Sequence, residues 1–320
     1  MFAKKISSFV TSLVILGIGL IAFQLKNIIK QNGKIDEPIK YWAVVLNPWN
    51  KNDNLRTMKR VMNRFGYQEV DGNQTEWDIL WMIEFPFDKT SLNFSHLKPH
   101  QKVNHIPGMS YLTNKLHLTT TTQSKYIPPA FQFPKMINEF KVFIETNPDT
   151  KFVEKNYDNR GVKIVEKSEI NFDMKTKYVQ QFVENPLLID GRVFDFGVYV
   201  LISSVNPLRI YRYKQEVLPR FCPDLYYPFD PKNIEKYVIY ETHIPVWKMP
   251  SLQNYINKLG FSFKTSIETH LTSRGYNIIK MWEQIDDAIV SLILSKEHNF
   301  INNVSYLNNY VIHYIIKQLI

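Results

Sequence analysis

The spacing of apolar residues near the start of the body predicts a β-α-β unit. Residues 41–47 and 77–84 are short apolar runs, as in buried strands. Residues 54–66, between them, repeat apolar positions with a helical period and end at Gly66. A strand, a helix and a second strand in this order are typical of a parallel sheet, because parallel strands need a long crossover.

The rest of the body predicts further helices and strands. Residues 102–121 predict a loop that leads into a short helix, and residues 134–146 predict a longer helix. Strands are predicted at 151–155, 162–167, 177–184, 192–203 and 208–213. Residues 251–296 have a helical pattern, with an apolar stripe formed by Met281, Ile285, Ala288, Ile289, Leu292 and Ile293. The pattern predicts a mixed α+β (α/β mixed) protein.

Charged residues interrupt the apolar stretch 186–213. Asp190 and Gly191 predict a turn between two strand-like segments, because both residue types are common in turns. Arg209 and Arg212 are expected at solvated or substrate-facing positions of a half-exposed strand. Asp195 also interrupts the apolar run.

The first 30 residues predict a membrane anchor. Residues 6–25 contain no charged residue, and a helix of this length spans a hydrocarbon layer of about 30 Å. A cleaved signal peptide and a buried soluble helix are the alternatives. More lysines follow the segment than precede it, which favours a cytosolic body in a single-pass membrane protein. Sequons at Asn73, Asn93 and Asn303 leave a luminal, glycosylated pseudoenzyme open.

Size, composition and charge narrow the function classes. The chain has 320 residues, of which 44% are hydrophobic, so it is long enough and apolar enough to fold around a core. Its formal charge of +9 favours acidic partners. No basic stripe interleaved with aromatic residues appears, which argues against nucleic-acid binding. The single cysteine, Cys222, excludes a disulfide framework and is interpreted as a small, semi-buried residue.

Several weak features in the middle of the chain together suggest a nucleotide site. Lys155 ends a predicted strand, and a turn containing Gly161 follows, where the backbone can approach phosphates closely. Residues 180–183 then form an extended segment whose backbone could pair with adenine. Each feature alone is common, and their order is what suggests the site.

Four stretches resemble the tubulin tyrosine ligase-like family in order and spacing. They are HIPGMSYLTNK, FVEKNYDNRGVKIV, YVQQFVENPLLIDGRVFDFGVYVLISSVNPLRIYRY and LPRFCPDLYYPFDP, and the resemblance covers about residues 40–298. The closest match is the membrane-anchored branch, which is grouped with probable tubulin polyglutamylases. The resemblance implies an ATP-grasp fold with ATP between two sheets. It also implies ATP-dependent ligation of an amino acid, expected to be glutamate, to tubulin or another acidic-tailed protein through an acyl phosphate.

The resemblance assigns roles to individual residues. Lys115 and Lys155 match the lysines that hold ATP phosphates, residues 159–162 match the loop over them, and residues 180–183 match the adenine segment. Arg220 matches a basic residue near the acceptor and the γ-phosphate, and is the catalytic candidate. The predicted ATP contacts are Lys115, Lys155, Asn159, Arg160, Gly161, Val162, Gln180, Gln181, Phe182, Val183 and Asp195.

Two departures from the family lead us to predict a defective enzyme. Gly197 replaces an arginine of the family, which removes a positive charge near the phosphates. The family's Mg²⁺ ligands follow the helix that ends near Lys296, and no Asp or Glu occurs here after Glu297. No metal ligand is therefore predicted. The alternative is a non-catalytic, membrane-anchored scaffold that binds ATP or microtubules.

The same comparison predicts how the chain is divided. In the family, the Mg²⁺ ligands lie on two strands after this helix. Without those strands, a sheet edge would be left that the Asn-rich tail covers in part. The expected segments are an anchor at 1–30, a linker at 31–40, a β-α-β subdomain at 41–124, a central ATP-grasp subdomain at 125–185, an incomplete C-terminal ATP-grasp subdomain at 186–298 and an atypical tail at 299–320.

Overall fold

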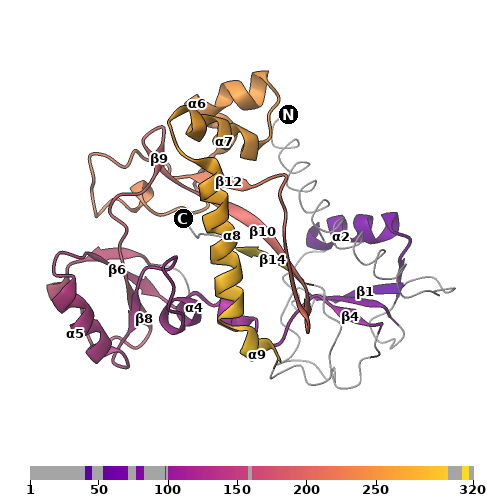
Figure 1. The fold of residues 1–320 in the computed structure, drawn as a ribbon, viewed down its shortest axis with the longest axis horizontal. Helices are drawn as coiled ribbons and strands as arrows, with labels where there is room; N and C mark the ends of the chain where they lie inside the picture. Colours follow the sequence, from indigo (N-terminus) through magenta and orange to yellow (C-terminus); the bar gives the residue numbers. More distant parts are fainter. Residues whose placement is uncertain are drawn as a thin grey trace. The chain divides into compact units, whose positions relative to one another are not determined.

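The structure is a computed structural model that describes residues 40–44, 53–70, 77–82, 98, 100–157, 161–301 and 312–316 (Figure 1). It is a mixed α+β protein made of two compact units. Unit 1 comprises Met1–Met109, Tyr199–Lys214 and Glu297–Ile315. Unit 2 comprises Ser110–Val198, Gln215–Lys296 and Ile316–Ile320. The subdomain boundaries expected from the sequence stay a prediction.

Unit 1 contains a four-stranded parallel sheet. Its strands follow the order β2-β1-β3-β4, and every neighbouring pair is parallel. The strands are β1 (Lys40–Val44), β2 (Gln68–Glu69), β3 (Ile79–Met82) and β4 (Lys102–Val103). Helix α2 (Asp53–Arg64) follows β1 and buries Met58, Val61 and Met62. The predicted β-α-β unit is confirmed, because α2 lies in the connection between the parallel strands β1 and β3.

Unit 2 contains a four-stranded antiparallel sheet in the order β5-β8-β6-β7. Its strands are β5 (Ala130–Gln132), β6 (Phe152–Asn156), β7 (Lys163–Val165) and β8 (Lys177–Gln181). Helix α5 (Ile137–Thr146) follows β5. Phe140 of α5 is fully buried and packs edge-on against Phe131 and Phe133 at centroid distances of 5.2 Å. These aromatic contacts fix the sheet that carries the predicted nucleotide residues.

Strand β10 (Arg192–Val205) is the longest strand in the described part of the chain. Residues 194–202 are buried without interruption, so both faces of the strand are covered there. Its partners are β9 (Leu188–Ile189), β11 (Leu208–Arg212), β12 (Leu218–Phe221) and β14 (Ile312–Ile316), and β13 (Ile244–Pro245) continues beyond β12. Pairing of β14 with β10 agrees with the expectation that the tail covers part of a sheet edge.

The last third of unit 2 is helical, as predicted. Helix α6 (Pro250–Gln253) runs into a π-helical turn (Asn254–Lys258), and α7 (Phe263–Ser273) and α8 (Ile278–Leu294) follow. Ser262 and Asn277 cap the starts of α7 and α8 through their side-chain oxygens. The predicted stripe of α8 is buried except for half-buried Met281, and each large aliphatic side chain contributes about 1.5–3 kcal/mol by burial.

Short elements complete the described chain. Helices α3 (Ser110–Thr113) and α4 (Lys115–Thr121) lead into unit 2, and α9 (Glu297–Ile301) follows α8. Single 3-10 turns occur at Lys167–Glu169, Ile234–Lys236 and Val246–Lys248. Sequence periodicity did not predict β2, β4, β5, β12 or β13, because runs of two to four residues are too short to show a period.

The predicted single-pass membrane localisation is corrected by the structure. Among the described residues, no helix is both long and apolar enough to span a bilayer. Residues 6–25, which carried that prediction, lie outside the described residues.

Candidate nucleotide site

Two lysines predicted to hold phosphates come together in unit 2. Lys155 lies near the end of β6, and Lys115 is the first residue of α4. Burial, together with the positive charge of Lys115, lowers the pKa of Lys155 to about 8. Two cations held near each other beside a buried strand repel one another. An anion between them would relieve that repulsion, so the pair suits a phosphate.

Gln180 fixes the position of the Lys155 ammonium group. In the antiparallel pair of β6 and β8, Lys155 lies opposite Tyr178, which places Gln180 diagonally across on the same face. Lys155 Nζ donates to Gln180 Oε1 at 2.7 Å, and Gln180 Nε2 donates to the carbonyl of Pro128 at 2.8 Å. Gln180 is only 6% exposed. It was predicted to contact adenine, and in the structure its amide orients the neighbouring lysine.

The predicted phosphate loop is described only in part. Asn159 and Arg160 lie outside the described residues, and Val162 is half-buried at the start of the strand that returns from the turn. Gly161 has φ +67, and a Cβ at this position would lie 2.8 Å from Asn156 Nδ2. Among the described residues, none bonds the buried Oδ1 of Asn156. A glycine is therefore required where the turn passes over Asn156.

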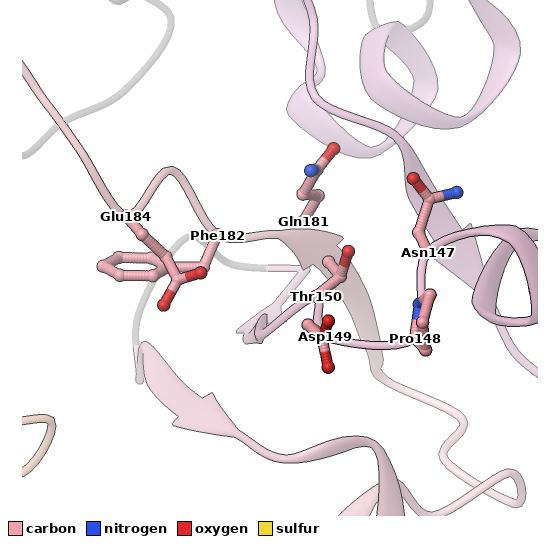
Figure 2. A pocket seen from close by; sticks show the side chains of 7 residues that line it. All are labelled: Asn147, Pro148, Asp149, Thr150, Gln181, Phe182 and Glu184. Carbon is pink, nitrogen blue, oxygen red and sulfur yellow. The ribbon is translucent and has the colours of Figure 1, made fainter.

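The predicted adenine segment borders a small pocket of about 270 Å³ (Figure 2). Gln181 and Phe182 line it together with Glu184, and the turn after α5 supplies Asn147, Pro148, Asp149 and Thr150. The Gln181 and Phe182 amides donate to the carbonyls of Pro129 and Lys151. Val183 is 54% exposed and does not line the pocket. The carboxylates of Asp149 and Glu184 make this pocket unsuitable for phosphates, which fit the lysine pair instead.

An aromatic cluster holds the predicted adenine segment in place. The Phe182 ring packs against Phe229 and Tyr237 at centroid distances of 5.8 and 5.7 Å. The Tyr226 hydroxyl donates to the carbonyl of Glu184 at 2.6 Å. All three partners lie in the stretch 226–237, so a segment more than 40 positions later in the chain holds residues 182–184 in place. This contribution was not predicted from the sequence, because a loop rich in Tyr and Pro has no period.

Asp195 and Arg220 form an ion pair. They lie opposite each other on β10 and β12, and Arg220 Nε donates to Asp195 Oδ1 at 2.9 Å, while Nη2 bonds Oδ2. Asp195 is 4% exposed. This two-point contact orients the guanidinium of Arg220 and neutralises a buried carboxylate. Both residues were candidates from the sequence, but their pairing was not predicted.

Cys222 follows directly after β12. It is fully buried rather than semi-buried, and burial raises the pKa of its thiol to about 12. The thiol is therefore protonated at neutral pH, and Cys222 acts as a packing residue.

The described residues fit ATP better than they fit a metal ion. The lysine pair and Gln180 present donors to a phosphate, beside a segment that borders a pocket. Within the described ranges, no three His, Cys, Asp or Glu side chains gather as a metal site. The predicted loss of Mg²⁺ ligands concerns residues 299–320, of which only 299–301 and 312–316 are described. The described residues therefore do not support that loss, nor the catalytic defect expected from it.

Comparison with known families agrees with the motifs above. A model described as "Tubulin-tyrosine ligase family" matches residues 94–313. The chain belongs to this family. The match begins later than the resemblance over residues 40–298 and extends further, into the segment expected to be an atypical tail.

The chain is similar to several tubulin polyglutamylases. It is 37% identical over 238 residues to a probable tubulin polyglutamylase of Caenorhabditis elegans, covering 72% of this chain and 46% of that protein. It is 28% identical over 269 residues to a probable beta-tubulin polyglutamylase of Tetrahymena thermophila, covering 74% and 22%. A tubulin polyglutamylase of Mus musculus is 24% identical over 263 residues, covering 76% and 31%. The chain thus spans less than half the length of these relatives.

Proposed function

We propose that the chain is an ATP-dependent ligase with an ATP-grasp fold that adds glutamate to carboxylates of tubulin or another acidic-tailed protein. The observation that carries this proposal is that Lys155 bonds Gln180 and feels the charge of Lys115, in a chain whose relatives are named tubulin polyglutamylases. The net positive charge of the chain is consistent with an acidic acceptor.

Different described residues bind different parts of the nucleotide. Lys115 and Lys155 bind the phosphates, and Gln180 holds the Lys155 ammonium group on the side where they lie. Residues 181–183 contact the adenine, supported by the ring of Phe229. A carboxylate is a poor electrophile, and ATP supplies a phosphate leaving group that activates it for attack by an amine.

Arg220 is the proposed catalytic residue at the acceptor end. Its guanidinium stabilises negative charge on the activated carboxylate, and Asp195 keeps it oriented on β12. The family implies Mg²⁺ beside the phosphates. The described residues offer no ligand set for it, so no step is assigned to the metal.

The proposal is tested by replacing the buried lysine. The full chain is incubated with ATP, Mg²⁺, glutamate and microtubules, and tubulin is measured by intact mass spectrometry. We expect a ladder of added glutamates, and we expect K155M to lower the rate by about 100-fold or more, because a preorganised charge is lost. K163M is the matched control, since Lys163 is an exposed lysine of the adjacent strand β7 and should leave the rate unchanged.

Measuring ATP binding separates the proposed ligase activity from the proposed nucleotide site. ATP binding without incorporation of glutamate into any acidic-tailed protein would contradict the ligase and would favour the non-catalytic scaffold. A chain whose ATP affinity is the same with and without Lys155 would contradict the site itself.

A further inference from the structure

A buried lysine at the end of α8 is not part of the proposed nucleotide site. Lys296 is 4% exposed, although lysine is among the residues least often buried. Its Nζ donates to the carbonyl of Thr121 at 2.9 Å and to Thr121 Oγ1 at 3.0 Å. Thr121 is the last residue of α4, and it lies 175 positions earlier in the sequence.

These contacts place a cation at the C-terminal end of α4. The last carbonyls of a helix have no partner within the helix and carry partial negative charge, so a lysine there both satisfies and stabilises them. Burial lowers the pKa of Lys296. Burying a cation is unfavourable unless it is hydrogen-bonded. The bonds of Lys296 to Thr121 offset this cost and hold the end of α4 in place.

Two further contacts hold α4 and the segment after it. Asp287 of α8 bonds the Tyr126 hydroxyl and pairs with Lys125 Nζ at 3.1 Å. Helix α4 also contacts β5, which pairs with β8 in the sheet that carries Lys155. Helix α4 is therefore fixed between α8 and the sheet that carries Lys155.

Helix α4 begins with Lys115, the second phosphate lysine. It has only seven residues and moves as a rigid element, so a shift of Thr121 at one end also shifts Lys115 at the other. We propose that Lys296 is a positioning residue: by anchoring the C-terminal end of α4 to α8, it sets the place of Lys115 relative to Lys155 and thereby the affinity for phosphate groups. This inference rests on the proposed function, in which Lys115 and Lys155 bind nucleotide phosphates.

The test compares a nucleotide with its nucleoside. Affinities of the full chain for ADP and for adenosine are measured by isothermal titration calorimetry. K115M is expected to weaken ADP binding about tenfold and to leave adenosine binding within about twofold. K296M is expected to give the same selective loss, because it misplaces Lys115. In the double variant K115M/K296M the losses should not add, because both changes remove one interaction.

Matched variants separate positioning from general damage. K280M removes an exposed lysine from the first turn of the same helix and should change neither affinity. K296R retains a cation and should recover most of the ADP affinity. If K296M does not fold, K296Q is the alternative: it keeps a donor but loses the charge and the length of lysine, so it should show the same selective loss of ADP affinity to a smaller extent.

Different outcomes overturn different statements. Equal losses of ADP and adenosine affinity in K296M, or additive losses in the double variant, would show a merely structural lysine and refute the inference. Unchanged ADP affinity in K296M with a clear loss in K115M would refute it as well. Unchanged ADP affinity in both K115M and K155M would instead refute the proposed phosphate site.

Discussion

At the scale of single residues, the candidate site is defined by its charges. Lys155 and Lys115 are held close enough to depress a pKa, whereas the carboxylate of Asp195 is engaged by Arg220. Lys155 was selected from the sequence by its place at a strand end before a turn, and Lys115 by its match to a family motif. What the sequence could not show is that Gln180 bonds Lys155, since that contact depends on the register of β6 against β8.

The depressed pKa of Lys155 predicts how nucleotide binding depends on pH. The free chain holds this lysine with a pKa of about 8, and a bound phosphate raises that value. Below pH 8 the lysine is already charged and ADP affinity should be flat. As pH rises above 8, binding must take up a proton, so affinity should fall by up to about tenfold per pH unit until the bound pKa is reached.

Calorimetry in buffers with different ionisation enthalpies measures this proton uptake. The variant K155R stays charged throughout the range and should lose the pH dependence. An ADP affinity that is flat from pH 7 to about pH 10 in the unmodified chain would show that Lys155 does not contact the phosphates.

At the scale of elements, a hairpin turn has a second role in starting a helix. Asp190 and Gly191 join β9 to β10 as a two-residue turn, as predicted, and Asp190 adopts a φ of +51. The Asp190 carboxylate also accepts the Ser251 amide at 3.0 Å and bonds its hydroxyl. It therefore supplies a cap for the first turn of α6, although 61 positions separate the two residues.

Replacing Asp190 should destabilise unit 2. D190A removes the cap and leaves an alanine in a left-handed conformation, so we expect the free energy of unfolding to fall by about 2 kcal/mol. D190N keeps both an acceptor and a residue type that tolerates this conformation, and should lose less. Urea denaturation followed by circular dichroism measures both, with D173A at an exposed position as the control. Equal losses in D190A and D173A would contradict the capping role.

At the scale of the whole molecule, residues far apart in sequence meet at close range within unit 1. Gly108 follows the short strand β4, and a Cβ added to it would overlap the backbone carbonyl of Asn299 in α9. Its φ is +78, so glycine is required both for conformation and for space. The match in HIPGMSYLTNK is thereby explained in part by packing rather than by chemistry.

A pair of glycine variants separates these two requirements. Gly66 has nearly the same φ, +79, and has no atom within 4 Å of an added Cβ. G66A should therefore lose about 1 kcal/mol through conformation alone. G108A should lose about 2 kcal/mol more, because the neighbouring backbone must move. Thermal unfolding of both variants tests this, and equal losses would show that α9 does not pack on Gly108 in solution.

The sequence by itself determined the type and order of most elements, including the β-α-β unit, the strand predicted at 192–203 and the apolar stripe of α8, because the periodicity of buried positions is a local property of the chain. It also determined the family, through side chains in fixed order. Tertiary structure decided which side chains meet: Lys155 with Gln180, Asp195 with Arg220, and Lys296 with Thr121. Such contacts depend on strand register and helix packing between distant segments, and no local pattern of residues specifies them.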